Sequence, residues 1–268
     1  MTLQSFHNQE EKVFKIREKF NWLTEKIKHI PFLDLPIQFD FESVQKEAAK
    51  ILKWAPNFIE PTYWDPESIQ NHANKNQGRA LIEYVPDSFF MHDTDHRLLK
   101  SMRSTNSYYN QFRSKEQYHS DGRIQFFKTE LATELPQTTQ LLYKISDYPM
   151  RCRIMKIQAN CHVGWHTHHT DHLTNDFYDF AVAQLPLDCE ETCLYSVRSN
   201  NSAYPQVYSR PARKGDLFVF NSYHQHNVVN TSNHDRIALF ANYSFDYEPF
   251  LEFLAPYVRD YDGPLINC

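Results

Sequence analysis

The sequence is organised around CHVGWHTHHTDH, residues 161–172, which contains five of the chain's fourteen histidines. Four potential metal ligands, His166, His168, His169 and Asp171, lie within six positions. Imidazole and carboxylate groups bind divalent transition metals, and residues two apart on a strand point the same way. The stretch therefore predicts a metal site, with a histidine-rich surface loop as the alternative.

A second stretch, from Gly215 to Arg236, favours the metal interpretation. A turn at Gly215 is followed by a β-rich run, a polar corner and His226, and a further β-rich run begins past Arg236. We therefore expect His226 where a strand meets a loop. If the two strands are neighbours, the Arg236 guanidinium points into the same pocket, where it can hold a carboxylate through two parallel hydrogen bonds. A surface or salt-bridged arginine is the alternative.

The overall composition narrows the classes of function. The chain has 268 residues, of which 41% are hydrophobic, enough to bury a substantial core. The net charge of −5 argues against nucleic acid or an anionic membrane as a partner, and no apolar run is long enough for a transmembrane helix. The polar start, Met1 to Glu11, lacks the apolar core of a signal peptide.

The five cysteines indicate a reducing compartment. An odd number of cysteines without a secretory signal favours free thiols and a cytoplasmic location. Cys189 and Cys193 are spaced like half of a metal clip, but no second cysteine pair lies nearby, so we expect no cysteine metal site.

The N-terminal half is predicted to be mainly helical and supporting. Apolar residues recur at three- and four-residue spacing over 13–27, before Pro31, and again from Phe41 to Leu52, before Pro56. Residues 136–145 are predicted as a helix with proline at its start, and 80–85 as a strand. The polar segment 104–117 is predicted as a long surface loop that covers a pocket.

After Tyr148 the sequence becomes rich in short β-runs. They span 151–157, 178–187, 192–197, 217–220 and 237–243. This spacing predicts a sandwich or barrel, including a double-sheet jelly roll. The predicted fold is mostly β with flanking helices. A helical region at 1–148 packs on a double-stranded β-helix (cupin-like jelly-roll) core at 149–248, and a helix near 250–257 lies in the tail at 249–268, all within a single compact domain.

Two segments carry a resemblance to a known family. Residues 157–168 and 215–236 resemble the iron(II)- and 2-oxoglutarate-dependent oxygenases of the aspartyl/asparaginyl β-hydroxylase type, and the resemblance extends over 151–243. It implies a jelly-roll core, Fe(II) and 2-oxoglutarate. It also implies that Arg236, ten residues after the distal histidine, binds the far carboxylate of 2-oxoglutarate.

The resemblance assigns His166 as the first metal ligand and His226 as the distal ligand. The family usually has an acid two residues after the first ligand, and here His168 occupies that position. A histidine followed two residues later by aspartate does occur, at His169 and Asp171, but it lies three residues after the position at which the family motif matches. Because residues two apart on a strand point the same way, the match of the motif favours a site of three imidazoles, from His166, His168 and His226. Asp171 is the alternative third ligand, and His169 with Asp171 is the alternative pair.

The sequence differs from the family pattern at two further points. The strand after the metal motif, around 177–180, offers no arginine as an extra co-substrate contact. Ala238, two residues after Arg236, stands where the family often has a hydroxyl group. Of the remaining side chains near the metal motif, His162 and Trp165 are candidates for lining the pocket.

Together, these observations predict an iron(II)- and 2-oxoglutarate-dependent dioxygenase. It would hydroxylate a C–H bond of an amino acid, an amino-acid derivative or a peptidyl residue, with succinate and CO2 as co-products. The alternatives are a three-histidine cupin-type dioxygenase that does not use 2-oxoglutarate, and a non-catalytic metal-binding protein. We expect a small-molecule or peptidyl substrate, and neither nucleic acid nor a membrane as a partner. The sequence predicts neither the substrate itself nor the oligomeric state.

Overall fold

The computed structural model describes residues 3–52, 54–56, 76–83, 126–165, 180–199 and 205–266. The helices in this part of the chain are α1 (Leu3–Lys28), α2 (Phe41–Ala48), α6 (Glu130–Glu134), α7 (Pro136–Ile145) and α8 (Glu248–Arg259). The first strands are β1 (Phe32–Asp34), β2 (Ala55–Pro56), β3 (Asn76–Glu83), β4 (Phe127–Lys128), β5 (Pro149–Ile157) and β6 (Cys161–His162). The later strands are β7 (Phe180–Asp188), β8 (Leu194–Arg198), β9 (Val207–Pro211), β10 (Phe218–Phe220), β11 (Gln225–Asn230) and β12 (Arg236–Ser244).

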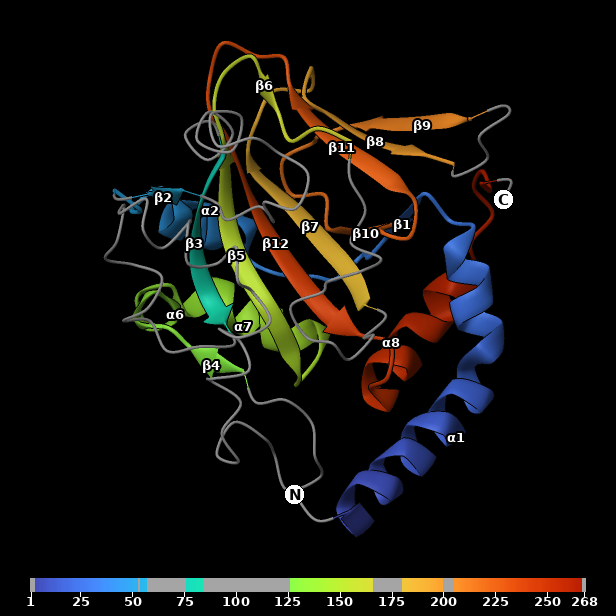
Figure 1. Cartoon of the computed structure of the whole chain (residues 1–268). Helices are drawn as coiled ribbons and strands as arrows, with labels where there is room; N and C mark the ends of the chain where they lie inside the picture. Colours follow the sequence, from blue (N-terminus) through green and yellow to red (C-terminus); the bar gives the residue numbers. More distant parts are fainter. Residues whose placement is uncertain are drawn as a thin grey trace.

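The strands form two antiparallel sheets that face each other (Figure 1). The major sheet has the order β1-β10-β7-β12-β5-β3-β2, with β4 paired to β3, and the minor sheet has the order β6-β11-β8-β9. From β5 to β12 the chain passes repeatedly between the two sheets, which is the arrangement of a double-stranded β-helix or jelly roll. The predicted fold class, mostly β with flanking helices, is confirmed.

Strand alternation gives the major sheet two buried faces. On one face, Leu239 and Ala241 of β12 belong to a core cluster shared with the helices. On the other, Phe220 of β10 belongs to a second cluster with Tyr195 of β8 and Val228 of β11, which lie in the minor sheet. Because α2, α6 and α7 contact strands of the major sheet from the helical side, these helices lie outside the space between the sheets (Figure 1).

The predicted helices are confirmed, with differences at their ends. The helix predicted over 13–27 belongs to α1, and the helix over 136–145 is α7. The helix predicted from Phe41 ends at Ala48, so Ile51 is buried beyond the helix while Leu52 is 89% exposed. The C-terminal helix is α8. The N-terminal half also supplies β1 and β3 to the major sheet, so it contributes strands to the sheet as well as covering helices.

The five β-runs predicted after Tyr148 correspond to β5, β7, β8, β10 and β12. The prediction missed β6, β9 and β11. The sequence of β11, QHNVVN, is polar at four of its six positions and lacks the apolar run by which the other strands were recognised. The strand predicted at 80–85 is part of β3, whose described residues end at Glu83. The loop predicted at 104–117 lies outside the described residues.

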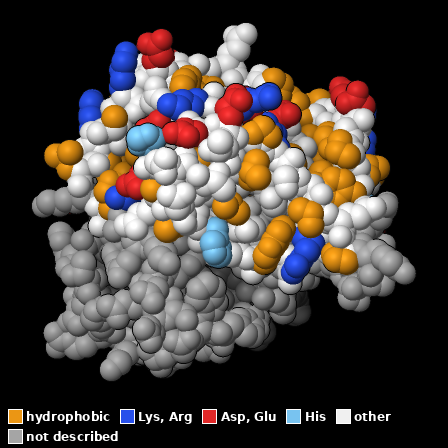
Figure 2. Space-filling view, turned by 90° about the horizontal axis from the view of Figure 1, so that it is seen from above, with side chains coloured by type: hydrophobic (Ala, Val, Ile, Leu, Met, Phe, Trp, Pro, Cys, Tyr) orange, Lys and Arg blue, Asp and Glu red, His pale blue; other side chains and the backbone are white. Residues whose placement is uncertain are grey.

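The face of the molecule seen from above has mixed charge. In the view from above, lysine and arginine side chains lie among acidic ones rather than in a continuous basic stripe (Figure 2). Within the described residues, no helix combines the length and the apolar character that crossing a membrane requires.

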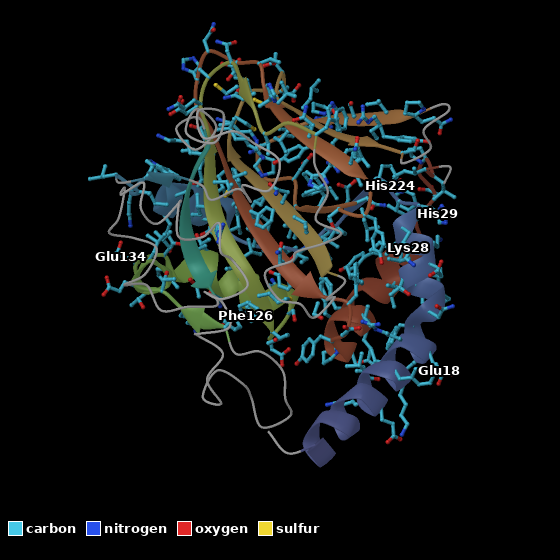
Figure 3. All side chains as sticks on the ribbon, in the orientation of Figure 1. Glu18, Lys28, His29, Phe126, Glu134 and His224 are labelled. Carbon is cyan, nitrogen blue, oxygen red and sulfur yellow. The ribbon has the colours of Figure 1, made fainter. Side chains whose placement is uncertain are left out.

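Asn221, in the corner between β10 and β11, ties this corner to the end of α1. Its Nδ2 donates hydrogen bonds to the carbonyl oxygens of Ile27 (3.2 Å), Lys28 (2.6 Å) and Ile30 (3.1 Å). The carbonyls at a helix C-terminus have no partner within the helix, so Asn221 satisfies groups that α1 leaves open. His224 lies beside the same end of α1, and one of its ring nitrogens hydrogen-bonds the Lys28 carbonyl oxygen (3.2 Å; Figure 3). The helix therefore helps to fix the corner that leads into β11.

Replacing Asn221 with alanine is expected to lower the free energy of unfolding by about 1–3 kcal/mol, because buried carbonyl groups lose their donor. The measurement is urea unfolding of the two proteins. The matched control is Asn21→Ala, which makes the same change at an exposed position of α1. Its urea midpoint of unfolding should equal that of the wild type within experimental scatter. Equal midpoints for Asn221→Ala and Asn21→Ala would contradict the capping role.

Candidate functional site

His226 is the second residue of β11 and is 2% exposed. Its Nδ1 lies 3.0 Å from the carbonyl oxygen of His224, an atom that only accepts hydrogen bonds, so Nδ1 carries the proton. In this tautomer the lone pair is on Nε2, the form in which imidazole binds a metal. The ring packs edge-on against Phe220, with 4.7 Å between centroids. The donor chemistry of His226 therefore fits a metal ligand at the edge of the space between the sheets.

Arg236, the first residue of β12, is 2% exposed and reaches across the space between the sheets. One of its terminal nitrogens donates to the Tyr195 hydroxyl on β8, and to Gln184 Oε1 on β7 at 3.4 Å. The guanidinium carbon lies 4.7 Å from the centroid of the Tyr195 ring. Arg236 thus joins the two sheets of the jelly roll from inside.

The Arg236 guanidinium is a buried cation without a described counter-ion. Burial lowers its pKa to about 10, and the nearby thiols of Cys189 and Cys193 oppose this shift. Its Nε has no hydrogen-bond partner among the described residues, and none of their carboxylates pairs with it. A buried charge is costly unless it is paired. The arrangement is that of a site prepared for an anionic ligand.

Strand register places Tyr195, a contact of the guanidinium, two residues along the strands from His226. In the pairing of β8 with β11, Val197 is opposite His226 and Tyr195 is opposite Val228. Tyr195 and His226 therefore lie on the same face of the minor sheet, two residues apart along the strands, which corresponds to about 7 Å. A short dicarboxylate can span such a separation, with one end at His226 and the other at Arg236.

The start of the metal motif runs alongside β11. In the pairing of β6 with β11, His162 is opposite Val229. The same register continues, because Val163 N donates to Val228 O (2.9 Å) and Gly164 N to Asn227 Oδ1 (3.0 Å). Gly164 has a φ of 89°, which favours glycine. Trp165, the last described residue before His166, is therefore level with His226.

Of the two pocket candidates of the sequence, His162 lies on the outer face of the minor sheet, and Trp165 lies beside Arg198. His162 is exposed and is paired with Val229, whereas His226 and Val228 face inward. Trp165 is 40% exposed, and its ring lies 4.9 Å from the guanidinium carbon of Arg198. Arg198 alternates with the inward-facing Val197, so it too is on the outer face.

The remaining predicted ligands, His166, His168, His169 and Asp171, lie outside the described residues. Among the residues that are described, no three histidine, cysteine, aspartate or glutamate side chains gather to form a metal site. Of the predicted site, the structure thus places His226 and Arg236, and it brings both to the same interior space.

Tyr195 and Gln184 are contacts of Arg236 that sequence reasoning missed. The Tyr195 hydroxyl accepts a hydrogen bond from Arg236 across the interior, from the opposite sheet. Gln184 supplies a polar contact from the strand after the metal motif, where the sequence offered no arginine. The available signal was a single glutamine within the apolar run 181–187, since a lone polar residue in a buried strand needs a partner.

Cys189 and Cys193 do not act together as a clip in the structure. Cys193 is fully buried, and its thiol donates to Asn230 Oδ1 at 3.0 Å. The Cys189 thiol donates to the Ala212 carbonyl oxygen at 3.4 Å. Burial raises the pKa of Cys189 to about 11, so at neutral pH its sulfur stays protonated.

Alkylation of Cys189 by iodoacetamide is therefore expected to be slow at pH 8 and to accelerate until the pH approaches 11. Only the thiolate reacts, and with a pKa of about 11 the thiolate fraction at pH 8 is about one in a thousand. The measurement is peptide mass spectrometry of the native protein over a pH series, with N-acetylcysteine as the reference thiol. A Cys189 rate that is half-maximal at the same pH as that of the reference thiol would contradict the shift.

Comparison with known proteins gives one family match and several distant structural likenesses. No curated protein sequence matches the chain. An oxidoreductase of the 2OG-Fe(II) oxygenase family from Burkholderia pseudomallei is 17% identical, over 88% of this chain and 90% of that chain, with a TM-score of 0.40. An oxalate oxidase in complex with the substrate analogue glycolate is 16% identical, over 42% of this chain and 47% of that chain, with a TM-score of 0.29. The match therefore spans about half the length of the oxalate oxidase.

The family match covers the jelly roll described above. Residues 101–244, more than half of the chain, match the family described as aspartyl/asparaginyl beta-hydroxylase. The matched segment contains β5 to β12, and with them His226, Arg236 and both contacts of the guanidinium. The chain belongs to the aspartyl/asparaginyl beta-hydroxylase family.

Proposed function

We propose that this chain is an iron(II)- and 2-oxoglutarate-dependent dioxygenase that hydroxylates a C–H bond of an amino acid, an amino-acid derivative or a peptidyl residue. The observation that carries the proposal is the buried Arg236 guanidinium, which has no described carboxylate partner and whose contact Tyr195 lies about two strand residues from His226. The family to which the chain belongs supports a hydroxylase.

In this proposal, His226 holds iron(II) together with His166 and His168. The Nδ1 hydrogen bond to the His224 carbonyl keeps the imidazole in the tautomer that presents Nε2 to the metal. Asp171 is the alternative third ligand, and His169 with Asp171 the alternative pair. When bound, iron(II) and 2-oxoglutarate supply the oxidising chemistry, in which 2-oxoglutarate, dioxygen and the substrate C–H group become succinate, CO2 and the alcohol.

Arg236 binds the carboxylate of 2-oxoglutarate that lies farther from the metal. Its planar guanidinium donates two parallel hydrogen bonds to a carboxylate. The Tyr195 hydroxyl and Gln184 hold the guanidinium from two strands, so it is oriented before the ligand arrives. The aromatic rings of Phe218 and Phe220 exclude water from this space and thereby strengthen the charge interaction.

The test is iron-dependent conversion of 2-oxoglutarate. The purified protein is loaded with Fe(II) without oxygen, 2-oxoglutarate is added, oxygen is admitted, and succinate is measured. We expect slow succinate formation even without the substrate, and none when iron is omitted. One equivalent of bound iron without 2-oxoglutarate binding or turnover would instead favour the three-histidine cupin-type dioxygenase. A protein that binds no iron would contradict both enzymes.

A further inference from the structure

Asn242 of β12 is a buried polar side chain that the proposed function leaves unused. It is 4% exposed, and its Oδ1 has no hydrogen-bond partner among the described residues. Nearly all buried polar groups in proteins are paired, because an unpaired one lowers stability. Such a cost is retained where a ligand supplies the missing partner.

Strand pairing places Asn242 on the inner face of the major sheet. Its neighbours Ala241 and Tyr243 belong to the core cluster on the helical side, so Asn242 points between the sheets. It pairs with Val182 of β7, which in turn pairs with Phe220 of β10. Because the Phe220 ring packs on His226, Asn242 belongs to the cross-strand row that borders the proposed iron ligand.

The backbone is irregular at the same place. Ala241 is opposite Cys152 of β5, whereas Tyr243 is opposite Pro149, so β5 has two residues between these partners and β12 has only Asn242. The extra residue is on β5, so β5 is the bulged strand and the bulge lies directly opposite Asn242; bulges are frequent next to active sites. The bulge is therefore a second observation, independent of hydrogen bonding, that marks the position.

Asn230 shows what a structural asparagine looks like in this fold. It is fully buried, and its Nδ2 donates to the carbonyl oxygens of Ile157, Gln158 and His234. Its Oδ1 accepts from Ser232 and from the Cys193 thiol. Both ends of this carboxamide are thus satisfied by the protein, in contrast to the Asn242 carbonyl.

We propose that Asn242 Oδ1 accepts a hydrogen bond from an N–H group of the substrate, and that it thereby positions the substrate at the His226 end of the interior. The inference rests on the proposed function and specifies the substrate class. The substrate bears an amide or ammonium N–H near the carbon that reacts. Asn242 is a substrate-positioning residue, and it takes no part in holding iron or 2-oxoglutarate.

The first test compares two identical substitutions at the two buried asparagines. Asn242→Leu removes an unsatisfied group and should raise the melting temperature of the metal-free protein by about 2 °C or more. Asn230→Leu leaves several partners without a bond and should lower it by at least about 4 °C. A loss of stability for Asn242→Leu comparable to that for Asn230→Leu would show a structural role and overturn the proposal. This comparison needs neither iron nor turnover, so it stands apart from the proposed function.

The second test measures substrate-stimulated succinate formation. The probes are the free L-amino acids and their N-acetyl methylamides. Each is tested beside a matched analogue, its twin, in which CH2 or N-methyl replaces the N–H donors. We expect stimulation by a donor-bearing probe and not by its twin, and a fall of about 10-fold or more in the stimulated rate for Asn242→Leu. The 2-oxoglutarate affinity should not change.

Stimulation that survives in Asn242→Leu, stimulation that the twins share, or no stimulation by any donor-bearing probe would overturn the assignment of Asn242. A wild-type protein that forms no succinate at all is a failure of the proposed function instead. In that case the stability comparison still decides whether Asn242 is a functional or a structural residue.

Discussion

Replacing His226 with alanine is expected to abolish iron retention. The substitution removes the imidazole whose tautomer is set by the hydrogen bond from Nδ1 to the His224 carbonyl. Loss of an outer hydrogen bond to a metal ligand already costs about 10- to 100-fold in metal affinity, so loss of the ligand itself should exceed 100-fold. The measurement is iron content after anaerobic loading and desalting, with about one equivalent expected for the wild type.

The matched control is His234→Ala. His234 lies in the loop before β12, its side chain is 79% exposed, and its ring nitrogen lies 3.7 Å from Glu190. This variant should retain iron as the wild type does. Retention of iron by His226→Ala, with the fold intact by circular dichroism, would remove His226 from the metal site. The same assay on His168→Ala and Asp171→Ala separates the alternative third ligands, because only replacement of the true ligand should lower the amount of bound iron.

Replacing Arg236 with glutamine is expected to weaken 2-oxoglutarate binding about 100-fold while iron stays bound. A charged hydrogen-bonding group that pairs with a carboxylate in a buried site contributes about 1.5–3 kcal/mol, which corresponds to roughly 10- to 150-fold in Kd. Arg236→Lys keeps the charge but loses the planar pair of donors, so we expect a smaller loss of about 10-fold. The measurement is equilibrium titration with 2-oxoglutarate under anaerobic conditions.

The control for this series is Arg213→Gln, which makes the same change in charge at an exposed arginine paired with Glu191 at 3.7 Å. It should leave the 2-oxoglutarate affinity unchanged. Stability offers a further check. Burial lowers the pKa of Arg236, so the folded state disfavours its charged form, and Arg236→Gln should not destabilise the protein in the absence of ligand. A large loss of stability would instead identify Arg236 as a structural residue.

The sequence predicted the jelly roll because most of its strands are apolar and short. The run 217–220 and the run 237–243 fall within or next to β10 and β12, and their patterns depend only on local burial. β11 could not be recognised in the same way, because its outward positions carry polar residues such as Gln225 and Asn227. Its existence follows from pairing with β8 and β6, which is a property of the folded chain.

The features of the site that depend on spacing along the sequence were predictable, and those that depend on which strands pair or face each other were not. His226 was expected at a junction between strand and loop and lies second in β11. Arg236 was expected near the start of the next strand, and in the same pocket as His226 if the two strands were neighbours. β11 and β12 instead lie in opposite sheets, and the guanidinium crosses between them. The contacts of Arg236 come from β7 and β8, and no local pattern indicates which strands will face β12. For the same reason, the outward direction of His162 became clear only from its pairing with Val229.

The central claim is that iron at His226 and the guanidinium of Arg236 hold the two ends of one 2-oxoglutarate molecule. The most direct measurement is an anaerobic titration of the Fe(II)-loaded protein with 2-oxoglutarate, monitored by the visible charge-transfer absorption of an iron(II)–keto-acid chelate. We predict a saturable band in the wild type, the same band at much higher 2-oxoglutarate concentration in Arg236→Gln, and no band in His226→Ala. The absence of a band in the iron-loaded wild type, or identical titrations of the wild type and Arg236→Gln, would contradict the claim.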